Sequence, residues 1–170
     1  MIIYIHGFAS SGFGSKPQKF KEYFEEEIIT ISLPTIPNLA IDTLEQIIEF
    51  SLNKEEPVYL VGSSLGGFYA LYLANKYDLK AVLINPAVNP WGTLDRYEGV
   101  DFVTNYYDNS RFEFTKNHIK SLKNYEVDFL KNPQNQNIQQ SQQNLGQVFH
   151  IALKNGLTSQ CSKQEILPLG

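Results

Sequence analysis

Ser64 is the residue whose surroundings most favour chemistry. It is the centre of Gly62-Ser63-Ser64-Leu65-Gly66, which fits the G-x-S-x-G pattern and lies between a run typical of a buried strand and a run typical of a helix. Small flanking residues let the chain turn sharply, force the serine into a strained conformation and hold its hydroxyl out at the carboxyl end of a sheet. The pattern predicts that Ser64 is a nucleophile. The alternative is a glycine-rich turn with a structural role or a phosphate contact, although the sequence lacks the Gly-Lys-Ser/Thr of a P-loop.

A second segment, His6-Gly7-Phe8, follows the first apolar run of the chain. Enzymes with such a serine turn hold the negative oxygen of the tetrahedral intermediate with two backbone N–H groups. One comes from the residue after the serine, and the other comes from a loop after an earlier strand. Here these groups are predicted to be the N–H of Leu65 and the N–H of Phe8. His6 is then expected to shape the loop and not to act as the catalytic base.

The elements that must position these residues alternate along the first 90 residues. Short apolar runs predict strands, and stretches with apolar residues on one face predict helices. Strands separated by helices predict a parallel sheet with right-handed crossovers, which is an α/β fold. The expected strands are 2–5, 28–33, 58–61 and 81–84, and the expected helices are 17–27, 40–52 and 65–76.

Composition limits the classes of function. A chain of 170 residues fits one domain, and a net charge of −4 without a basic block argues against nucleic acid or an anionic membrane as the main partner. No targeting signal follows Met1, and no apolar run reaches the ~18 residues of a membrane-spanning helix. The single cysteine, Cys161, excludes an internal disulfide, so we expect a cytoplasmic protein. His6, His118 and His150 lack the spacing of metal ligands, and we expect neither a metal nor a cofactor.

The chain changes character twice after residue 90. Residues 90–131 are rich in aromatic residues without a clear period, which fits either a lid over a substrate pocket or an excursion that packs on the sheet. Nine of the eleven glutamines lie in 134–170, and no aspartate follows Asp128. We therefore expect a domain over 1–133 and an atypical tail over 134–170. Two explanations of the tail stay open: a polar segment without a fold, or the product of a shifted reading frame.

Three segments together resemble the YqiA/YcfP-like small esterases of the α/β-hydrolase superfamily. They run from Tyr4 to Ser11, from Val61 to Ala70 and from Asn85 to Val88, and the segment from Phe114 to Asp128 is also similar. The resemblance covers residues 2 to about 133. It implies a small α/β-hydrolase-like parallel sheet flanked by helices, hydrolysis of short acyl esters, and Ser64 as nucleophile.

The same resemblance implies that a strand ending in Gly-Asp-Glu and then a Gly-Gly-x-His segment should supply the acid and the base of a catalytic triad. Neither is present, and residues 136–143 have the composition of a poor buried strand, so the fold is expected to be incomplete at its carboxyl end. The family position of His118 makes that residue non-catalytic. His150 is the weak candidate base, with Asp101, Asp108 or Asp128 as the orienting acid, and a partly buried or surface histidine is the favoured alternative. Glu165 follows His150, which is the wrong order for the acid.

Three functions remain open for a chain with these residues. The first is a serine hydrolase of the esterase type, whose partner is a small-molecule ester. The second is a catalytically impaired form that binds an ester or acyl group without turnover. The third is a thioesterase or acyltransferase, since nucleophiles other than water can resolve an acyl-enzyme.

Overall fold

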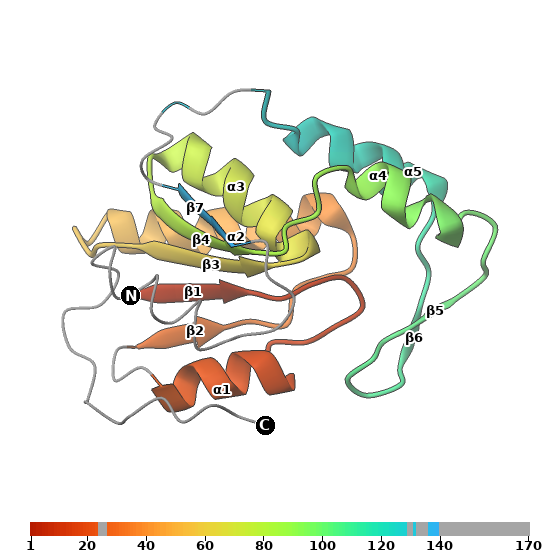
Figure 1. Cartoon of the computed structure of the whole chain (residues 1–170), viewed down its shortest axis with the longest axis horizontal. Helices are drawn as coiled ribbons and strands as arrows, with labels where there is room; N and C mark the ends of the chain where they lie inside the picture. Colours follow the sequence, from red (N-terminus) through yellow and green to blue (C-terminus); the bar gives the residue numbers. More distant parts are fainter. Residues whose placement is uncertain (24–26, 129–130, 132–135, 140–170) are drawn as a thin grey trace.

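The computed structural model describes residues 1–23, 27–128, 131 and 136–139, and its centre is a parallel sheet (Figure 1). Five strands pair in the order β2-β1-β3-β4-β7, and every pairing is parallel. The predicted parallel α/β fold is therefore confirmed. The strands are β1 (Ile2–Ile5), β2 (Ile28–Thr30), β3 (Tyr59–Ser63), β4 (Lys80–Ile84) and β7 (Gln136–Gln139).

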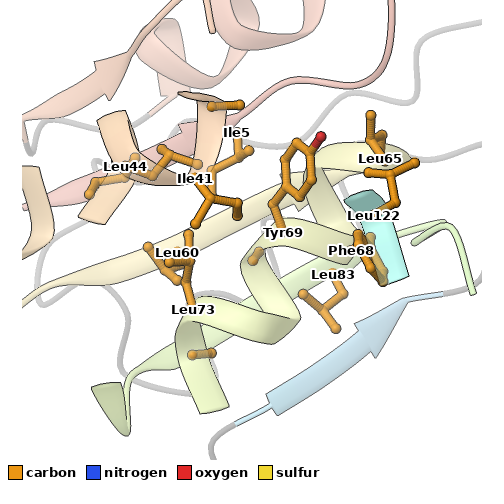
Figure 2. Close-up of a cluster of buried hydrophobic side chains, with 14 of the residues drawn as sticks. Ile5, Ile41, Leu44, Leu60, Leu65, Phe68, Tyr69, Leu73, Leu83 and Leu122 are labelled. Atoms are coloured by element: carbon orange, nitrogen blue, oxygen red, sulfur yellow. The ribbon is translucent and has the colours of Figure 1, made fainter. Parts of the chain in front are cut away.

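Alternating side chains of the strands build two apolar layers. On one face, Ile5, Leu60 and Leu83 pack with side chains of α2 (Pro37–Leu52) and α3 (Leu65–Tyr77), as Figure 2 shows. On the other face, side chains of Tyr4, Val61 and Val82 form a second cluster with Phe20 of α1 (Ser15–Tyr23). The sheet thus has helices on both faces, as continuous apolar strands require.

The helices follow the predicted pattern with shifted ends. Pro37 is tolerated in the first turn of α2, which has no hydrogen bond to lose there, so this helix begins three residues before the predicted start at Ala40. Two polar contacts tie α2 to α3: Lys76 Nζ to Glu45 Oε1 at 2.7 Å, and Tyr77 Oη to Glu49 Oε1 at 2.6 Å. No helix in the described part of the chain is long and apolar enough to cross a membrane.

Strand β2 is shorter than predicted, because it ends at Thr30 and not at Leu33. The backbone N–H of Leu33 donates a hydrogen bond to the His6 ring (2.9 Å) and not to a neighbouring strand. Gly12 also lies so close to Thr30 that a Cβ there would be 2.5 Å from the Thr30 carbonyl oxygen. The loop after β1 therefore takes the space in which the strand would continue.

Strand β7 shows that part of the segment expected to be a poor buried strand, residues 136–139, does join the sheet, at its edge. Residues 136–139 pair with 81–84 of β4, although the expected domain ends at residue 133. The backbone groups of the buried β4 need partners along this side, and β7 supplies them. Among the described strands β7 pairs on one side only, and an edge position tolerates a polar strand that a central position would not.

The aromatic-rich segment after β4 is a set of short elements that pack onto the central domain. Buried side chains of this segment, among them Leu94, Phe114 and Leu122, belong to the same apolar cluster as α2 and α3. Trp91 packs on Phe68 of α3. Of the two interpretations, packing on the domain is the one these contacts support. The elements are α4 (Pro90–Leu94), η1 (Asp95–Tyr97), β5 (Val103–Thr104), β6 (Arg111–Phe112), α5 (Lys116–Ser121) and η2 (Leu122–Tyr125).

Truncating Leu44 tests the layer between α2 and the sheet. Leu44 is 1% exposed, whereas Leu39 of the same helix is 50% exposed. We expect Leu44→Ala to lower the free energy of unfolding by about 2–5 kcal/mol, because it leaves a cavity in the core. Leu39→Ala is the matched control and should change it by less than about 0.5 kcal/mol. Urea denaturation of both variants measures the difference, and equal losses would contradict this packing.

Candidate active site

Ser64 lies in the sharp turn between β3 and α3, in a conformation that L-residues rarely adopt (φ 55°, ψ −120°). Backbone hydrogen bonds hold the turn. The Ser64 N–H donates to the Ile84 carbonyl at 3.0 Å, and the Ser64 carbonyl accepts from the N–H of Gly67 (2.9 Å) and of Ala87 (3.0 Å). The turn is thus fixed by β4 and by the first turn of α3.

The side chain of Ser64 is exposed, whereas those of its neighbours Ser63 and Leu65 are buried. Within the described part of the chain, the Ser64 hydroxyl has no hydrogen-bond partner. The strained backbone predicted from the sequence is therefore present, and it presents a free hydroxyl at the carboxyl end of β3.

Glycines allow the chain to pass this close to itself. A Cβ at Gly66 would lie 2.1 Å from the Ile5 carbonyl oxygen, and a Cβ at Gly62 would lie 2.3 Å from the Gly66 carbonyl oxygen. Gly7 approaches the serine itself, since its Cβ would lie 3.2 Å from Ser64 Cβ and 3.7 Å from Ser64 Oγ. The loop after β1 and the start of α3 therefore meet around Ser64 without room for a side chain between them.

His6 is a structural residue of this loop. Its Nε2 accepts a hydrogen bond from the Leu33 N–H at 2.9 Å, so Nδ1 carries the proton and donates to the Gly7 carbonyl at 2.8 Å. Burial lowers the pKa of His6, while the bond to Gly7 opposes the shift. A neutral ring with both nitrogens engaged is not free to take a proton from Ser64, which agrees with the role expected from the sequence.

The two backbone N–H groups expected to form an oxyanion site flank the serine. Leu65 is the first residue of α3, where a helix leaves its N–H groups without internal partners. Phe8 follows Gly7, where a Cβ would lie 3.2 Å from Ser64 Cβ. Within the described residues, neither N–H donates a hydrogen bond.

The ring of Phe8 anchors the loop after β1 (residues 6–10), a contact the sequence did not reveal. It packs on Tyr97, Phe112 and Phe114, with ring centroids 5.2, 5.7 and 4.7 Å away. These partners come from the segment that follows β4. The aromatic excursion therefore fixes the loop that carries the Phe8 N–H.

The β5–β6 hairpin adds polar contacts to the same loop. The Tyr106 N–H donates to the Ala9 carbonyl at 2.8 Å, and the Asn105 side chain donates to the Ser10 carbonyl at 3.2 Å. Ala9 itself has a positive φ of 52°. The hairpin thus holds the loop in a conformation that it would not favour alone.

Two pockets adjoin the loop of residues 6–10, and His6, Gly7, Phe8 and Ser10 line both of them. The larger has a volume of about 260 Å³, and Ser64, Tyr4 and Lys16 are among its lining residues. The smaller has a volume of about 30 Å³, and its side chains are mostly apolar, with Phe8, Leu65 and Tyr69 among them. In Figure 2, Leu65 and Tyr69 belong to the cluster on the α2 and α3 face.

Among the residues that the structure describes, no expected triad partner is found beside Ser64. His118 forms a capping box with Thr115 at the start of α5, and its ring packs on Phe114. Asp101, Asp108 and Asp128 are exposed. The Asp108 carboxyl accepts hydrogen bonds from Ser110, and these bonds lower the pKa of Asp108.

The remaining candidates lie where the structure gives no placement. His150, the candidate base, is outside the described residues, as are Glu165 and Cys161, which were not expected to take part in a triad. The resemblance described above implies an acid after a late strand, whereas the sequence after β7 continues with Gln140-Ser141. The described part of the chain thus presents the serine and two N–H groups, but no base.

An alanine at position 66 tests the contact between α3 and β1. Gly66→Ala should lower the free energy of unfolding by about 1–3 kcal/mol or more, because the new methyl meets two backbone carbonyls that cannot move independently. Gly67→Ala is the control in the same helix, because both variants gain the same helix propensity from alanine. Its new Cβ would meet the ring of Pro86 at 2.9 Å, which is a milder clash than the 2.1 Å at Gly66. Thermal and urea unfolding should show the larger loss at Gly66; the reverse order would contradict the contact.

The buried His6 predicts a pH dependence of stability. Its pKa is lowered in the folded chain, so its contribution is complete above about pH 6.5 and is lost as the pH falls, because the unfolded chain binds the proton more readily. Unfolding free energy should therefore fall as the pH is lowered through about 6.5, with a part of the slope that comes from this group. His6→Gln should remove that part of the slope, whereas His118→Gln should keep it; identical slopes in all three chains would refute the assignment.

Comparison with known proteins identifies the family. The model of the "Uncharacterised protein family (UPF0227)" matches residues 1–147, which extends past residue 133 and includes β7. UPF0227 protein YcfP of Escherichia coli O7:K1 is 28% identical over 160 residues, covering 89% of this chain and 85% of that protein. YcfP of Salmonella gallinarum is 28% identical over 124 residues, covering 65% and 69%.

A solved structure, a putative hydrolase from Agrobacterium vitis S4, matches with a TM-score of 0.50 and 19% identity over 74% of this chain. The chain spans 61% of the length of that structure. At this identity the likeness shows the fold, which is of the α/β-hydrolase type. The Ser64 turn thus lies on an α/β-hydrolase-type fold. The chain belongs to the UPF0227 family.

Proposed function

We propose that this protein is a serine hydrolase of the esterase type that acts on short acyl esters through Ser64. The observation that carries the proposal is the exposed hydroxyl of Ser64 in a strained turn at the carboxyl end of β3. A non-glycine residue with positive φ is unfavourable, and such strain is concentrated at functional sites. Four backbone hydrogen bonds to Ser64 maintain this conformation.

In this mechanism Ser64 Oγ attacks the carbonyl carbon of the ester and transfers its proton to a base. The N–H groups of Phe8 and Leu65 hold the resulting oxyanion. The bond from the carbonyl carbon to the alcohol oxygen then breaks, and the alcohol leaves with the proton. Water attacks the acyl-Ser64 ester in the same way, which releases the acid and restores the serine.

The small apolar pocket supports a short acyl group. It is much the smaller of the two pockets, at about 30 Å³ against about 260 Å³, which favours a short acyl group over a long chain. Leu33, Leu65 and Tyr69 supply apolar lining there, beside the backbone of Phe8. An acetyl ester is the class of substrate that this space fits best.

The base is the incomplete part of the proposal. His150 is the candidate, with Asp101, Asp108 or Asp128 to orient it. Without a base, an oxyanion site and binding alone leave about 10³–10⁴-fold acceleration over water. An impaired form that binds an acyl group without turnover is therefore the second candidate, favoured by the absence of a base among the described residues. Resolution of the acyl-enzyme by a thiol or alcohol, as in an acyltransferase, uses the same first step.

Labelling with a fluorophosphonate and weighing the intact protein tests whether Ser64 is activated. We expect one adduct on the full chain and none on Ser64→Ala, because the reagent requires an activated serine. With 4-nitrophenyl acetate, Ser64→Ala should lower kcat/KM by at least about 10³-fold. His150→Ala should lower it similarly if that residue is the base.

Ser63→Ala is the matched control, since Ser63 is adjacent to Ser64 but is only 7% exposed. It should retain the adduct. An unlabelled but folded chain would overturn the esterase and leave the impaired form. Products formed with added alcohols or thiols would reveal acyl transfer.

A further inference from the structure

The larger pocket beside Ser64 has a polar character that ester hydrolysis itself does not require. Its lining residues include Tyr4, Ser10, Ser15, Ser63 and Lys16, together with Ser64. Four residues with hydroxyl groups and one lysine, besides the proposed nucleophile, therefore line one space of about 260 Å³, and the buried Tyr4 and Ser63 are joined by a side-chain hydrogen bond. No carboxylate is among the described residues that line it.

Lys16 brings a positive charge that the described part of the chain does not neutralise. The ion pairs found there join Lys76 to Glu45 and Lys116 to Glu98, and Lys16 has neither an ion pair nor a hydrogen bond through its side chain. A lysine whose charge is used for structure would have an acidic partner. This one is exposed at the rim of a cavity that contains the hydroxyl of Ser64.

The hydroxyl groups are suited to donate hydrogen bonds. Burial raises the pKa of Tyr4 to about 12, so its hydroxyl keeps its proton at neutral pH. Serine hydroxyls rotate to suit their partner, and each can donate one hydrogen bond. An ammonium group with several hydroxyl donors is the usual environment of a carboxylate or a phosphate.

The two pockets differ in polarity and in volume, and these differences indicate which pocket takes the acyl part and which takes the alcohol part of an ester. The apolar pocket, of about 30 Å³, takes the acyl group in the proposed function. The polar pocket adjoins the same loop, residues 6–10, since His6, Gly7, Phe8 and Ser10 line both pockets. The alcohol part of an ester bound at Ser64 is left with the polar pocket, whose volume is several times larger.

We propose that the pocket lined by Tyr4, Ser10, Ser15, Ser63 and Lys16 binds a negatively charged group, a carboxylate or a phosphate, on the alcohol part of the ester. The inference rests on the proposed function and narrows its substrates to short acyl esters of small anionic alcohols. Lys16 is then a specificity-determining residue and takes no part in the bond-breaking steps.

Paired substrates test the inference with the full chain. Phenyl acetate and 4-acetoxybenzoate share the acetyl group, and the second adds a carboxylate to the leaving group; acetyl phosphate tests the phosphate. We expect Lys16→Gln to lower kcat/KM for the two anionic substrates roughly three- to tenfold relative to phenyl acetate, since an exposed ion pair contributes little more. Lys19→Gln, an exposed lysine of the same helix that does not line the pocket, should leave the ratio unchanged. The effect should weaken in high salt.

A binding measurement separates this inference from the proposed function. Ser64→Ala protein is titrated with 4-hydroxybenzoate, with inorganic phosphate and with phenol by ligand-observed NMR, with and without the second substitution Lys16→Gln. Weaker binding of the anions alone in the double variant would support the anion pocket even if the chain turns over no ester. Turnover with ratios that Lys16→Gln leaves unchanged would overturn the anion pocket and keep the esterase. Anion binding that is absent, or that is equally strong in the single and the double variant, would overturn it in either case.

Discussion

The contact between the first turn of α3 and the end of β1 is the constraint on which the site depends. Because Gly66 has no side chain, α3 approaches the carbonyls of Ile5 and His6 closely enough to place Ser64 beside Gly7. The same approach brings the N–H of Leu65 and the loop that carries the Phe8 N–H to the serine. A bulkier residue would move the helix, and the serine and both donors would separate together. The positions of Ser64 and of the two N–H groups therefore depend together on this one contact.

Much of this architecture could be predicted because its signals are local. The apolar runs of β1, β3 and β4 and the amphipathic α2 are visible in short windows, and the strain at Ser64 follows from the spacing of glycines. The polar strand β7 was missed, since a strand is tolerated or rejected by its position in the sheet and not by composition alone. The packing of Phe112 and Phe114 on Phe8 was also out of reach, because it joins residues about a hundred positions apart.

The chemistry of the site is divided by one short loop. Residues 6–10 place His6 on the β2 side, where it fixes Leu33, and Phe8 against the aromatic segment after β4. The polar and the apolar pocket are both lined by residues of that loop. An ester spanning it would have its two halves sorted by polarity while its carbonyl lies at the serine. Selectivity and reactivity would then depend on the same few backbone atoms, which explains why the loop is held from several directions.

The pairing of β7 with β4 has a consequence for the order of folding. Strands β1 to β4 and the helices between them are complete by Ile84, so this part can assemble while synthesis continues. The free side of β4 then has to wait until residues 136–139 emerge and close a long loop, which is a slow, non-local step. During that interval an apolar strand presents unpaired backbone groups, and nascent chains at high concentration can join through it. The late polar strand therefore covers the side of β4 that would otherwise stay open to pairing with another chain.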